Sequence, residues 1–316
     1  MISVAMCTFN GEKYIKEQIE SIINQSLVPD EIIICDDCSK DNTVNIIKET
    51  LDNWSGKVYL VVNEKNLGYR KNFEKAISLC HGDIIFLSDQ DDVWNKDKIE
   101  IIKTEIEKDK NILLAFHDVE IVDENLCLIN KSFWNVLHFD YMQFLENDFR
   151  RLMESNVIQV SACAFKKNLF YFAEPFPEAA IHDEWLGLIA LLKGKVKPVN
   201  LILAKYRQSG NNAIGAGKIS LREKINKWLL NLNKSTDFHV RELKRRRLIL
   251  SYLIDIYEKS DNIYIIKQYY TFLNKRINYI NNKKIINVDY FNMIGKNVRA
   301  IKIIMKDIFS ALIYKK

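Results

Sequence analysis

The sequence lacks the features that mark secreted, membrane-spanning and disulfide-linked proteins. No uninterrupted apolar run approaches the roughly 18 residues that a membrane-spanning helix needs. The N-terminus has neither the basic region nor the cleavage site of a signal peptide. The six cysteines are scattered, mostly within apolar runs, which is typical of reduced thiols rather than a disulfide framework. We therefore expect a cytoplasmic protein.

The chain also offers little to suggest a metal cluster, a repeat or a linker. Cys35 and Cys38 form a C-x-x-C pair, for which zinc or redox chemistry stays open. No second Cys/His pair at metal-site spacing completes a zinc site. No internal repeat or low-complexity stretch interrupts the 316 residues, a length that suits one large domain and an appendage.

What the chain does have is an uneven distribution of charge. Residues 218–316 carry 22 Lys and Arg against 8 Asp and Glu, a net charge of +14, whereas the whole protein has only +5. The preceding 217 residues are therefore acidic, with a net charge of −9. An acidic body joined to a basic tail suggests that the two parts meet different partners.

Apolar strands alternate with helical patterns in residues 1–110, and this alternation predicts an α/β fold. Strands that read as nearly continuous apolar runs favour a mostly parallel sheet covered by helices on both faces. The strands expected here cover residues 2–7, 31–35, 58–62 and 83–87, and two of the helices cover 13–24 and 70–80. Further strands are expected at 113–122, 157–165 and 196–206, while 130–155 has few pattern clues.

Each of the first four strands ends in polar residues. These are Thr8, the pair Asp36 and Asp37, Asn63, and the pair Asp89 and Asp91. Because the carboxyl ends of parallel strands meet at one edge of a sheet, we expect these side chains to border a ligand crevice.

The most informative run is Phe86–Trp94, where an apolar strand gives way to three carboxylates. In an extended segment alternate side chains share a face, so Asp89 and Asp91 would point the same way. Two converging carboxylates suit a hard divalent cation, Mg²⁺ or Mn²⁺. The alternative is a polar turn in which Asp92 or Asn95 caps the following helix.

A change of character after residue 215 predicts a second domain. Residues 210–217 are rich in Gly and Asn, and the segments that follow have helical period, near 219–232, 238–258, 262–281 and 288–314. We expect one domain over residues 1–215 and a basic, all-helical domain over 216–316.

Several motifs, in order along the chain, together resemble the inverting glycosyltransferases of family two. They are Ser3–Asn10, Gln18–Ile22, Asp36–Thr43, Asn66–Gly68 and Ser88–Trp94. The resemblance covers about residues 1–215 and implies the GT-A fold, a Rossmann-like mixed sheet. The run Ser88–Trp94 and the stretch 206–212 look most like the rhamnosyltransferase branch.

The resemblance implies a donor site for a nucleoside diphosphate sugar. Thr8 and Asp37 match the positions that hold a pyrimidine base, and Phe9 would cover the face of the base. Asp36 is assigned mainly to turn formation. Asp91 would hold the metal, and Asp89 would contact the ribose or a metal-bound water.

Two basic residues are candidates for the diphosphate, and two departures from the family pattern touch the same region. Arg70 begins a helix beside the crevice, with solvated surface charge as its alternative, and Arg207 would act as a bidentate donor. Ser209 stands where a metal- or phosphate-binding His is expected. The run Ser161–Cys163 lacks an expected Gly, which would narrow the acceptor pocket.

Inversion requires a general base for the acceptor hydroxyl. Family members carry it about where Asp183 stands, on a segment entering a helix. Asp183 is the first candidate, Glu184 the second, and His182 the third by its intrinsic pKa.

We therefore expect a metal-dependent glycosyltransferase with dTDP-rhamnose or a UDP-hexose as donor and a cell-surface saccharide, polyprenyl-linked, as acceptor. A nucleotidyltransferase is the alternative, but Asn10–Glu12 is too sparse in glycine for its phosphate loop. A nucleic-acid-binding protein is the second alternative, which the acidic body disfavours because it would repel a polyanion.

The tail leaves two roles open. Its last helix mixes apolar and basic residues across 298–316. It would either pack on the core or form a homodimer, or it would lie on the anionic inner face of the plasma membrane and make the enzyme peripheral.

Overall fold

A computed structural model describes residues 1–145, 150–208, 232–259 and 263–282, together with Asp307 and Ser310. The chain divides into two compact units, Met1–Ala216 and Gly217–Lys316. The boundary expected between 215 and 216 falls within 209–231, outside the described residues, and so stays a prediction.

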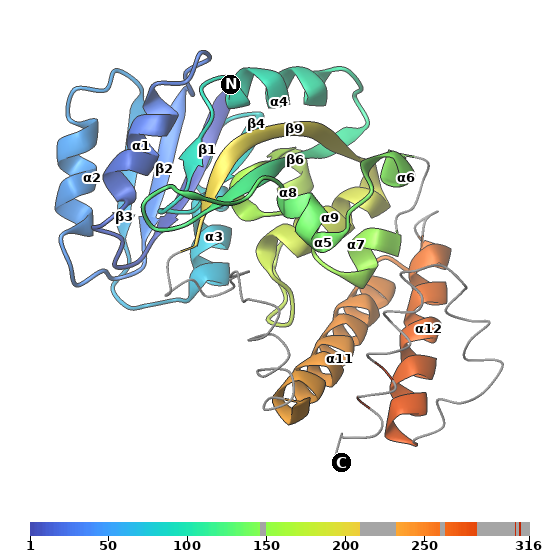
Figure 1. The fold of residues 1–316 in the computed structure, drawn as a ribbon. Coiled ribbons are helices and arrows are strands. Elements are labelled where there is room, and N and C mark those ends of the chain that lie inside the picture. Colours follow the sequence, from blue (N-terminus) through green and yellow to red (C-terminus); the bar gives the residue numbers. More distant parts are fainter. Residues whose placement is uncertain (146–149, 209–231, 260–262, 283–306, 308–309, 311–316) are drawn as a thin grey trace. The chain divides into compact units, whose positions relative to one another are not determined.

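The described part of the first unit is built around one sheet (Figure 1). Its strands are β1 (Ile2–Thr8), β2 (Glu31–Asp36), β3 (Lys57–Val62), β4 (Ile84–Ser88), β5 (Val93–Trp94), β6 (Ile112–Val122), β7 (Leu128–Asn130), β8 (Cys163–Lys166) and β9 (Lys195–Arg207). They lie in the order β3-β2-β1-β4-β8-β6-β9-β5, and β7 pairs with β6. The first four strands and the β6–β9 pair run parallel, while β8 runs antiparallel to β4 and β6, so the sheet is mixed.

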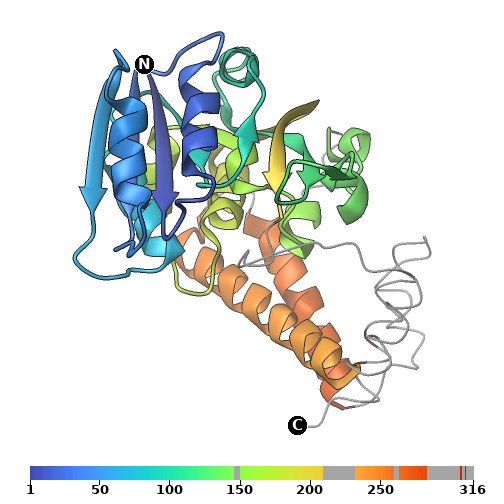
Figure 2. The ribbon, with the colours of Figure 1, turned by 60° about the vertical axis from the view of Figure 1, so that its left-hand side comes forward.

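Helices cover both faces of this sheet. They are α1 (Ile15–Ile23), α2 (Thr43–Leu51), α3 (Tyr69–Ser78), α4 (Lys98–Glu107), α5 (Phe133–Leu137), α6 (Tyr141–Leu145), α7 (Arg150–Glu154), α8 (Asn168–Ala173) and α9 (His182–Lys193). One buried cluster contains isoleucines from α1, α2 and α4. They pack with alternate residues of β1, β2 and β4. The helix α3 packs against β1, β2 and α9, and its buried residues lie outside that cluster (Figures 1 and 2).

The pattern of burial along the strands follows from this layering. Every residue of β1, β2 and β4 is buried, as expected for parallel strands between two helical layers. The strand β3 differs because it is at the edge of the sheet, and its Val58, Tyr59 and Val62 side chains are exposed. The sequence pattern placed this strand correctly but did not reveal its edge position.

One predicted strand is wrong over much of its length. Residues 157–165 were expected to be extended, but the strand β8 begins only at Cys163. A single 3₁₀ turn, η1 (Val160–Ala162), precedes it. The side chains of Gln159 and Ser161 hydrogen-bond to the segment that follows β4. These tertiary contacts override the apolar pattern.

The order of the strands creates the place for a ligand. The strand β1 lies between β2 and β4, so the direction in which the chain winds reverses there. In open α/β sheets ligands bind at such a reversal, outside the carboxyl ends of the strands. Here those ends are Thr8 of β1 and Ser88 of β4, next to the predicted site residues.

The described part of the second unit consists mainly of two helices. Helices α11 (Leu232–Ile256) and α12 (Ile263–Asn281) pack against each other, which confirms the helices expected near 238–258 and 262–281. Asp307 is fully buried and accepts two hydrogen bonds from Arg276, at 2.8 and 2.9 Å, and one from His239 at 2.7 Å. The helix expected over 288–314 and most of that over 219–232 lie outside the described residues.

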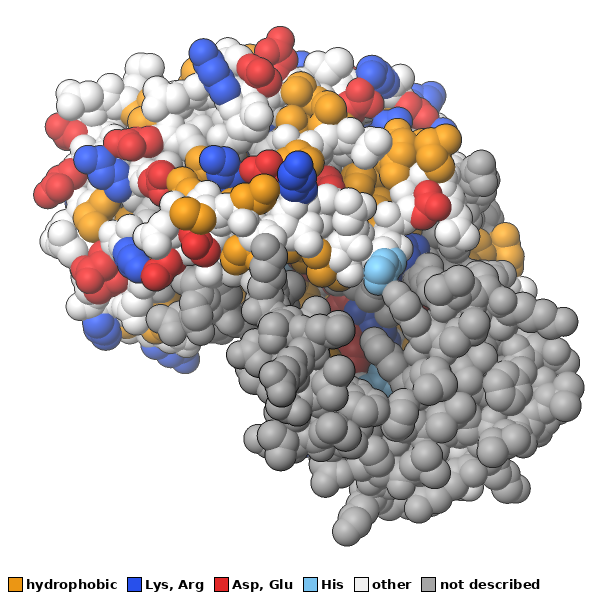
Figure 3. Space-filling model, in the orientation of Figure 1, with side chains coloured by type: hydrophobic (Ala, Val, Ile, Leu, Met, Phe, Trp, Pro, Cys, Tyr) orange, Lys and Arg blue, Asp and Glu red, His pale blue; other side chains and the backbone are white. Residues whose placement is uncertain are grey.

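On the face of the first unit in Figure 3, acidic, basic and apolar side chains are interspersed. None of the described helices has the length and hydropathy needed to cross a membrane.

Candidate active site

Thr8 and Asp36 are joined at the carboxyl ends of β1 and β2. The Thr8 hydroxyl donates to Asp36 Oδ1 at 2.8 Å. Asp36 also accepts from the main-chain N–H of Ser39 at 2.8 Å and from its hydroxyl at 2.6 Å. The turn role expected for Asp36 is therefore present, and Thr8 retains only acceptor capacity toward a ligand.

Asp37 anchors the turn that leads into α3. Its carboxylate accepts from Asn63 Nδ2 at 2.9 Å, Leu67 N at 2.7 Å and Gly68 N at 2.9 Å. Gly68 has a φ of +80°, a conformation that glycine adopts without strain. The structure thus assigns Asp37 to the loop that positions α3, and its predicted contact with a nucleotide base stays a prediction.

Phe9 lies between the ends of β1 and β4. Its main-chain N–H donates to Gln90 Oε1 at 2.8 Å, and its carbonyl accepts from Gln90 Nε2 at 3.1 Å. Phe9 is nevertheless 45% exposed. Gln90 therefore fixes the main chain of Phe9, while the ring remains available for stacking on a planar ligand.

The three carboxylates after β4 lie close enough to perturb one another. Burial raises the pKa of Asp89 well above its usual range, and the charges of Asp92, Asp91 and Asp183 raise it further. Burial and Asp92 raise the pKa of Asp91 to about 7. Crowded carboxylates of this kind favour a bound cation, which would relieve their repulsion.

Neither Asp92 nor Asn95 caps the following helix, so that alternative is wrong. The N-cap residue of α4 is Asp97. Asp92 is instead buried and accepts from the Arg207 main-chain N–H at 3.0 Å and from Gln159 Nε2 at 3.2 Å. Its carboxylate thus connects the turn after β4 to the end of β9 and to the segment before η1.

Arg207 lies beside the carboxylates but is bound to protein acceptors. Its Nε donates to the carbonyl of Asp91 at 2.8 Å, its Nη1 to the carbonyl of Glu124 at 2.7 Å, and its Nη2 to the carboxylate of Glu17. The side chain is only 2% exposed. The geometry favours a role in holding the Asp91 main chain, and the predicted contact with a diphosphate stays untested.

Sequence reasoning missed the residues that support this turn from behind. Lys98 is fully buried and donates to the carbonyl of Ser161, whose hydroxyl accepts from the Asp89 N–H at 3.1 Å. Ser161 is also fully buried. The sequence did contain one indication that Lys98 is buried. At helical spacing Lys98 shares the apolar face of α4 with Ile102 and Ile106.

Asp183 has the properties of a general base. It lies in the first turn of α9, is 3% exposed, and accepts from Asn156 Nδ2 at 2.9 Å and from the Glu184 N–H at 2.7 Å. Burial, with a smaller contribution from the charge of Glu184, raises the pKa of Asp183 to about 7. Its charge also raises the pKa of Asp89, so the structure brings together two carboxylates that are far apart in the sequence.

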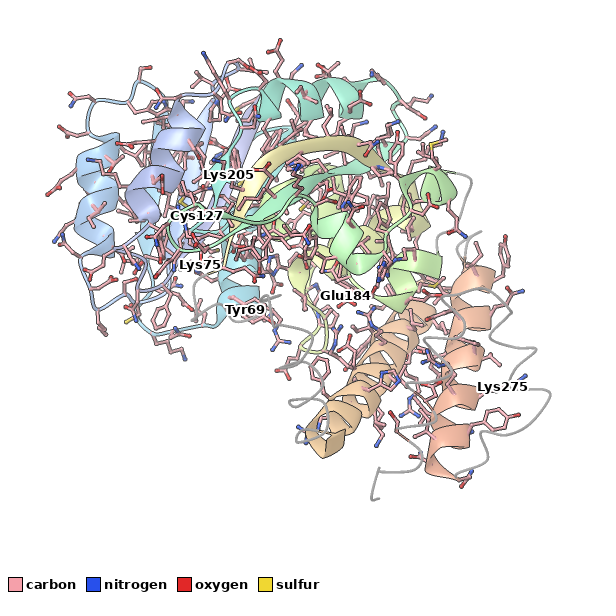
Figure 4. All side chains as sticks on the ribbon, viewed as in Figure 1. Tyr69, Lys75, Cys127, Glu184, Lys205 and Lys275 are labelled. Carbon is pink, nitrogen blue, oxygen red and sulfur yellow. The ribbon has the colours of Figure 1, made fainter. Side chains whose placement is uncertain are left out.

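Glu184 and His182 flank this carboxylate. Glu184 is also buried in the first turn of α9 (Figure 4). The His182 ring stacks on Phe73 with 4.1 Å between ring centroids, and burial, with the charge of Arg70, lowers its pKa to about 3. An imidazole with so low a pKa is a weak proton acceptor, which disfavours His182 as the base.

Arg70 lies on the same side of the site. It follows Tyr69, labelled in Figure 4, at the start of α3, and its guanidinium carbon is 5.6 Å from the centroid of the Tyr69 ring. Because its charge acts on His182, Arg70 lies near the beginning of α9. Arg70 and Asp183 are therefore placed by two helices, α3 and α9, that pack together.

The residues present suit a cation that the protein only partly surrounds. Within the described part of the chain no group of three or more His, Cys, Asp or Glu side chains is arranged to hold a metal. Asp89 and Asp91 would supply hard oxygen ligands. Burial first, and then the charges of neighbouring carboxylates, raise their pKa values, and a cation would balance that negative charge. Mg²⁺ commonly binds through one or two carboxylates plus substrate phosphates and water, which fits this donor set.

The cysteines and Ser209 were the other residues that the sequence raised in connection with a metal. All six cysteines are free, and burial raises the pKa of Cys35 to about 11. Ser209, where a histidine was expected, lies outside the described residues.

Comparison with known proteins identifies related sequences. A family model described as "Glycosyl transferase family 2" matches residues 3–171. The dTDP-rhamnosyl transferase RfbG of Shigella flexneri is 30% identical over 249 residues, which cover 72% of this chain and 80% of that protein. The Escherichia coli protein WfgD, a UDP-Glc:alpha-D-GlcNAc-diphosphoundecaprenol beta-1,3-glucosyltransferase, is 25% identical over 258 residues, covering 80% and 92% of the two chains.

Solved structures are similar in fold. S. aureus TarS 1–349 in complex with UDP-GlcNAc superposes with a TM-score of 0.61 at 17% identity, covering 98% of this chain and 88% of that one. The mannosyltransferase PcManGT of Pyrobaculum calidifontis, in complex with GDP-Man and Mn²⁺, gives 0.56 at 12% identity, with coverage of 99% and 86%.

The buried charge of Asp183 predicts a dependence of stability on pH. Because its folded pKa, about 7, exceeds the ordinary value of 3.8, the folded state binds more protons than the unfolded state between these values. Stability is therefore lost as pH rises from about 4 to about 7. Asp183→Asn keeps both hydrogen bonds and removes the charge, so at pH 8 it should be more stable than the parent by roughly 2–4 kcal/mol.

Urea denaturation at pH 5 and pH 8 measures this effect. The advantage of Asp183→Asn should shrink at pH 5, where the parent carboxyl is protonated. Asp52→Asn, at an exposed position, is the control and should change little at either pH. An equal advantage at both pH values would contradict the buried-charge explanation.

Proposed function

Because this chain belongs to glycosyltransferase family 2, we propose that it transfers a sugar from a nucleoside diphosphate donor to a saccharide acceptor, with inversion at the anomeric carbon. The observation that carries the proposal is Asp183, a buried carboxyl with a pKa of about 7 whose charge reaches Asp89. A base poised near neutral pH beside a phosphate-binding edge is what inverting transfer requires.

The family and the activity class expected from the sequence are confirmed. The family match covers residues 3–171, more than half of the chain, and the relatives RfbG and WfgD are named as glycosyltransferases. The GT-A fold is confirmed by the family match, by the likeness to TarS and by the mixed sheet.

In the proposed mechanism Asp183 takes the proton of the acceptor hydroxyl as it attacks. The acceptor oxygen forms a bond to the anomeric carbon while the bond from that carbon to the phosphate oxygen breaks. The nucleoside diphosphate leaves with the bonding electron pair. Asn156 and the Glu184 N–H hold the Asp183 carboxylate during this step, and Glu184 is the second candidate for the base.

The donor would lie across the carboxyl ends of β1 and β4. Phe9 offers an exposed ring for the base, and Thr8 and Asp37 border the same edge. Arg70 would face the diphosphate. It is half-buried at the start of α3, and its charge contributes to the lowered pKa of His182, the residue before Asp183. Arg207 would contribute indirectly, by holding the Asp91 main chain.

We propose that Asp91, with Asp89, holds a divalent cation, Mg²⁺ or Mn²⁺. Such a cation, when bound, would neutralise charge on the leaving diphosphate. The crowding of Asp89, Asp91 and Asp92 supports this proposal.

The donor and acceptor are proposed from the relatives. RfbG is named as a dTDP-rhamnosyl transferase, and the name of WfgD gives UDP-Glc as donor and a diphosphoundecaprenol-linked sugar as acceptor. We therefore propose dTDP-rhamnose or a UDP-hexose as donor and a cell-surface saccharide on a polyprenyl carrier as acceptor. Family membership favours this function over a nucleotidyltransferase or a nucleic-acid-binding protein.

Association with the inner face of the plasma membrane stays a prediction, as does a homodimer. Both rest on the net charge of +14 in residues 218–316 and on the amphipathic stretch 298–316. In that stretch the structure describes only Asp307 and Ser310.

Replacing the proposed base should stop turnover without preventing donor binding. Asp183→Asn should lower kcat by roughly 100-fold or more, because the acceptor hydroxyl loses its proton acceptor. Release of nucleoside diphosphate from a panel of sugar nucleotides gives the rate, and calorimetry gives the affinity for the donor. Glu184→Gln is the matched variant. If Glu184→Gln is inactive and Asp183→Asn is active, Glu184 and not Asp183 is the general base.

Removing one proposed metal ligand should abolish transfer in a folded protein. Asp91→Asn should raise the barrier by several kcal/mol, roughly 3–5, because charge on the leaving diphosphate is no longer balanced. Turnover is measured with Mg²⁺ or Mn²⁺ and after treatment with EDTA. Normal turnover of Asp91→Asn, or of the EDTA-treated parent, would refute the metal-dependent mechanism.

The role of Asp37 can be separated into base recognition and loop anchoring. Asp37→Ala should weaken binding of UDP by about 1–3 kcal/mol, because Asp37 would no longer accept from the base or from the 67–68 turn. Uracil carries an N3–H and cytosine does not, so base recognition predicts that the parent prefers UDP to CDP and that the variant loses this preference. Calorimetry with UDP, CDP and GDP decides. Equal losses for UDP and CDP would leave Asp37 as a loop anchor only.

A further inference from the structure

Lys98 is a lysine buried directly behind the proposed metal site. It is the first residue of α4 and has no exposed surface. Its Nζ lies 3.4 Å from the centroid of the Trp94 ring and donates to the main-chain carbonyl of Ser161. Lysine is almost never fully buried unless it is paired, so this position requires an explanation.

The partner of Lys98 leads directly to the carboxylates. Ser161 uses its hydroxyl to accept from the Asp89 N–H at 3.1 Å. Two residues earlier, Gln159 donates to Asp92 Oδ2 at 3.2 Å. The segment 159–161 therefore supports the turn 89–92 at two points, and Lys98 holds that segment by its main chain.

The interaction of Lys98 with the carboxylates is also electrostatic. The charges of Lys98 and Asp92 attract, and this attraction opposes the effect that burial has on each group. Elsewhere on the same helix Lys103 makes an ordinary surface ion pair with Glu107 at 2.5 Å. The two lysines thus share a helix but differ in environment.

Burying an amine at this place is costly for folding. A methionine has nearly the same length and could pack against Trp94 through its sulfur without the desolvation cost. A lysine is expected at such a position when its hydrogen bond serves the neighbouring site, since functional sites commonly keep groups that stability alone would not favour. The positive charge of Lys98 would by itself oppose a bound cation, so a loss of cation affinity on its removal would come from the lost hydrogen bond.

We propose that Lys98 is a positioning residue that, through Ser161, holds the turn 89–92 in the arrangement that binds a divalent cation and a diphosphate. This proposal rests on the proposed function, because it assumes that Asp89 and Asp91 form that site. Lys98 itself would not touch the substrate, because it has no exposed surface. It would act on the carboxylates only through the segment 159–161.

Lys98→Met tests the proposal by metal binding rather than by turnover. Free Mn²⁺ is measured by electron paramagnetic resonance in a titration of the folded protein, and UDP binding with Mn²⁺ present is measured by calorimetry. Thermal unfolding establishes that the variant is folded. We expect the Mn²⁺ affinity of Lys98→Met to fall about tenfold, whereas Lys103→Met, the matched control on α4, should bind Mn²⁺ like the parent.

Ser161→Ala provides a second, milder variant. It removes the hydroxyl that accepts from the Asp89 N–H and leaves the carbonyl that Lys98 contacts. It should weaken Mn²⁺ binding in the same direction, by roughly threefold. If Lys98→Met fails to fold, Ser161→Ala decides, and parental Mn²⁺ affinity in that variant overturns the proposal.

The outcomes separate this proposal from the function on which it rests. A parent protein that binds neither Mn²⁺ nor UDP would refute the proposed function. A parent that binds both, with a folded Lys98→Met that binds Mn²⁺ equally well, would refute the role of Lys98 alone.

Discussion

The desolvation of several neighbouring carboxylates, together with their mutual repulsion, is the constraint on which the site depends. Asp89, Asp91 and Asp92 follow one another after β4, and Asp183 acts on the first of them from the start of α9. Burial makes each negative charge costly, and proximity increases the cost. Such a cluster persists only because the surrounding structure holds it, and it favours either protons or a cation. Base and metal chemistry would then arise from one electrostatic arrangement.

The support for this cluster comes from segments that are remote in the sequence. The Asp92 carboxylate accepts from the end of β9 and from Gln159, and Arg207 holds the Asp91 carbonyl. After the neighbouring strand β2, Asp37 organises the turn into α3. The side chains of Asp37 and Asp92 and the main chain of Asp91 are thus fixed by hydrogen bonds, which reduces the reorganisation required when a charged ligand binds.

Sequence reasoning correctly predicted the elements whose structure follows from the local pattern of apolar and polar residues. The strands β1, β2 and β4 are continuous apolar runs, and the polar residues that end them do meet, as the bonds from Thr8 to Asp36 and from Asn63 to Asp37 show. Sequence reasoning failed for the residues whose structure is determined by contacts with segments far away in the sequence. The aromatic side chains of residues 133–145 pack around Phe116 through short helices that have no clear period, and Lys98 belongs to no motif.

Arg207 also has a mechanical consequence. It lies at the end of β9, just before the chain continues toward the second unit, and its guanidinium binds the main chain of Asp91 and Glu124 and the side chain of Glu17. Through this guanidinium and the Asp92 carboxylate, which accepts from the Arg207 N–H, the end of β9 is joined twice to the turn after β4. A displacement of the main chain at residue 207 would therefore be passed directly to the backbone of the proposed metal ligand.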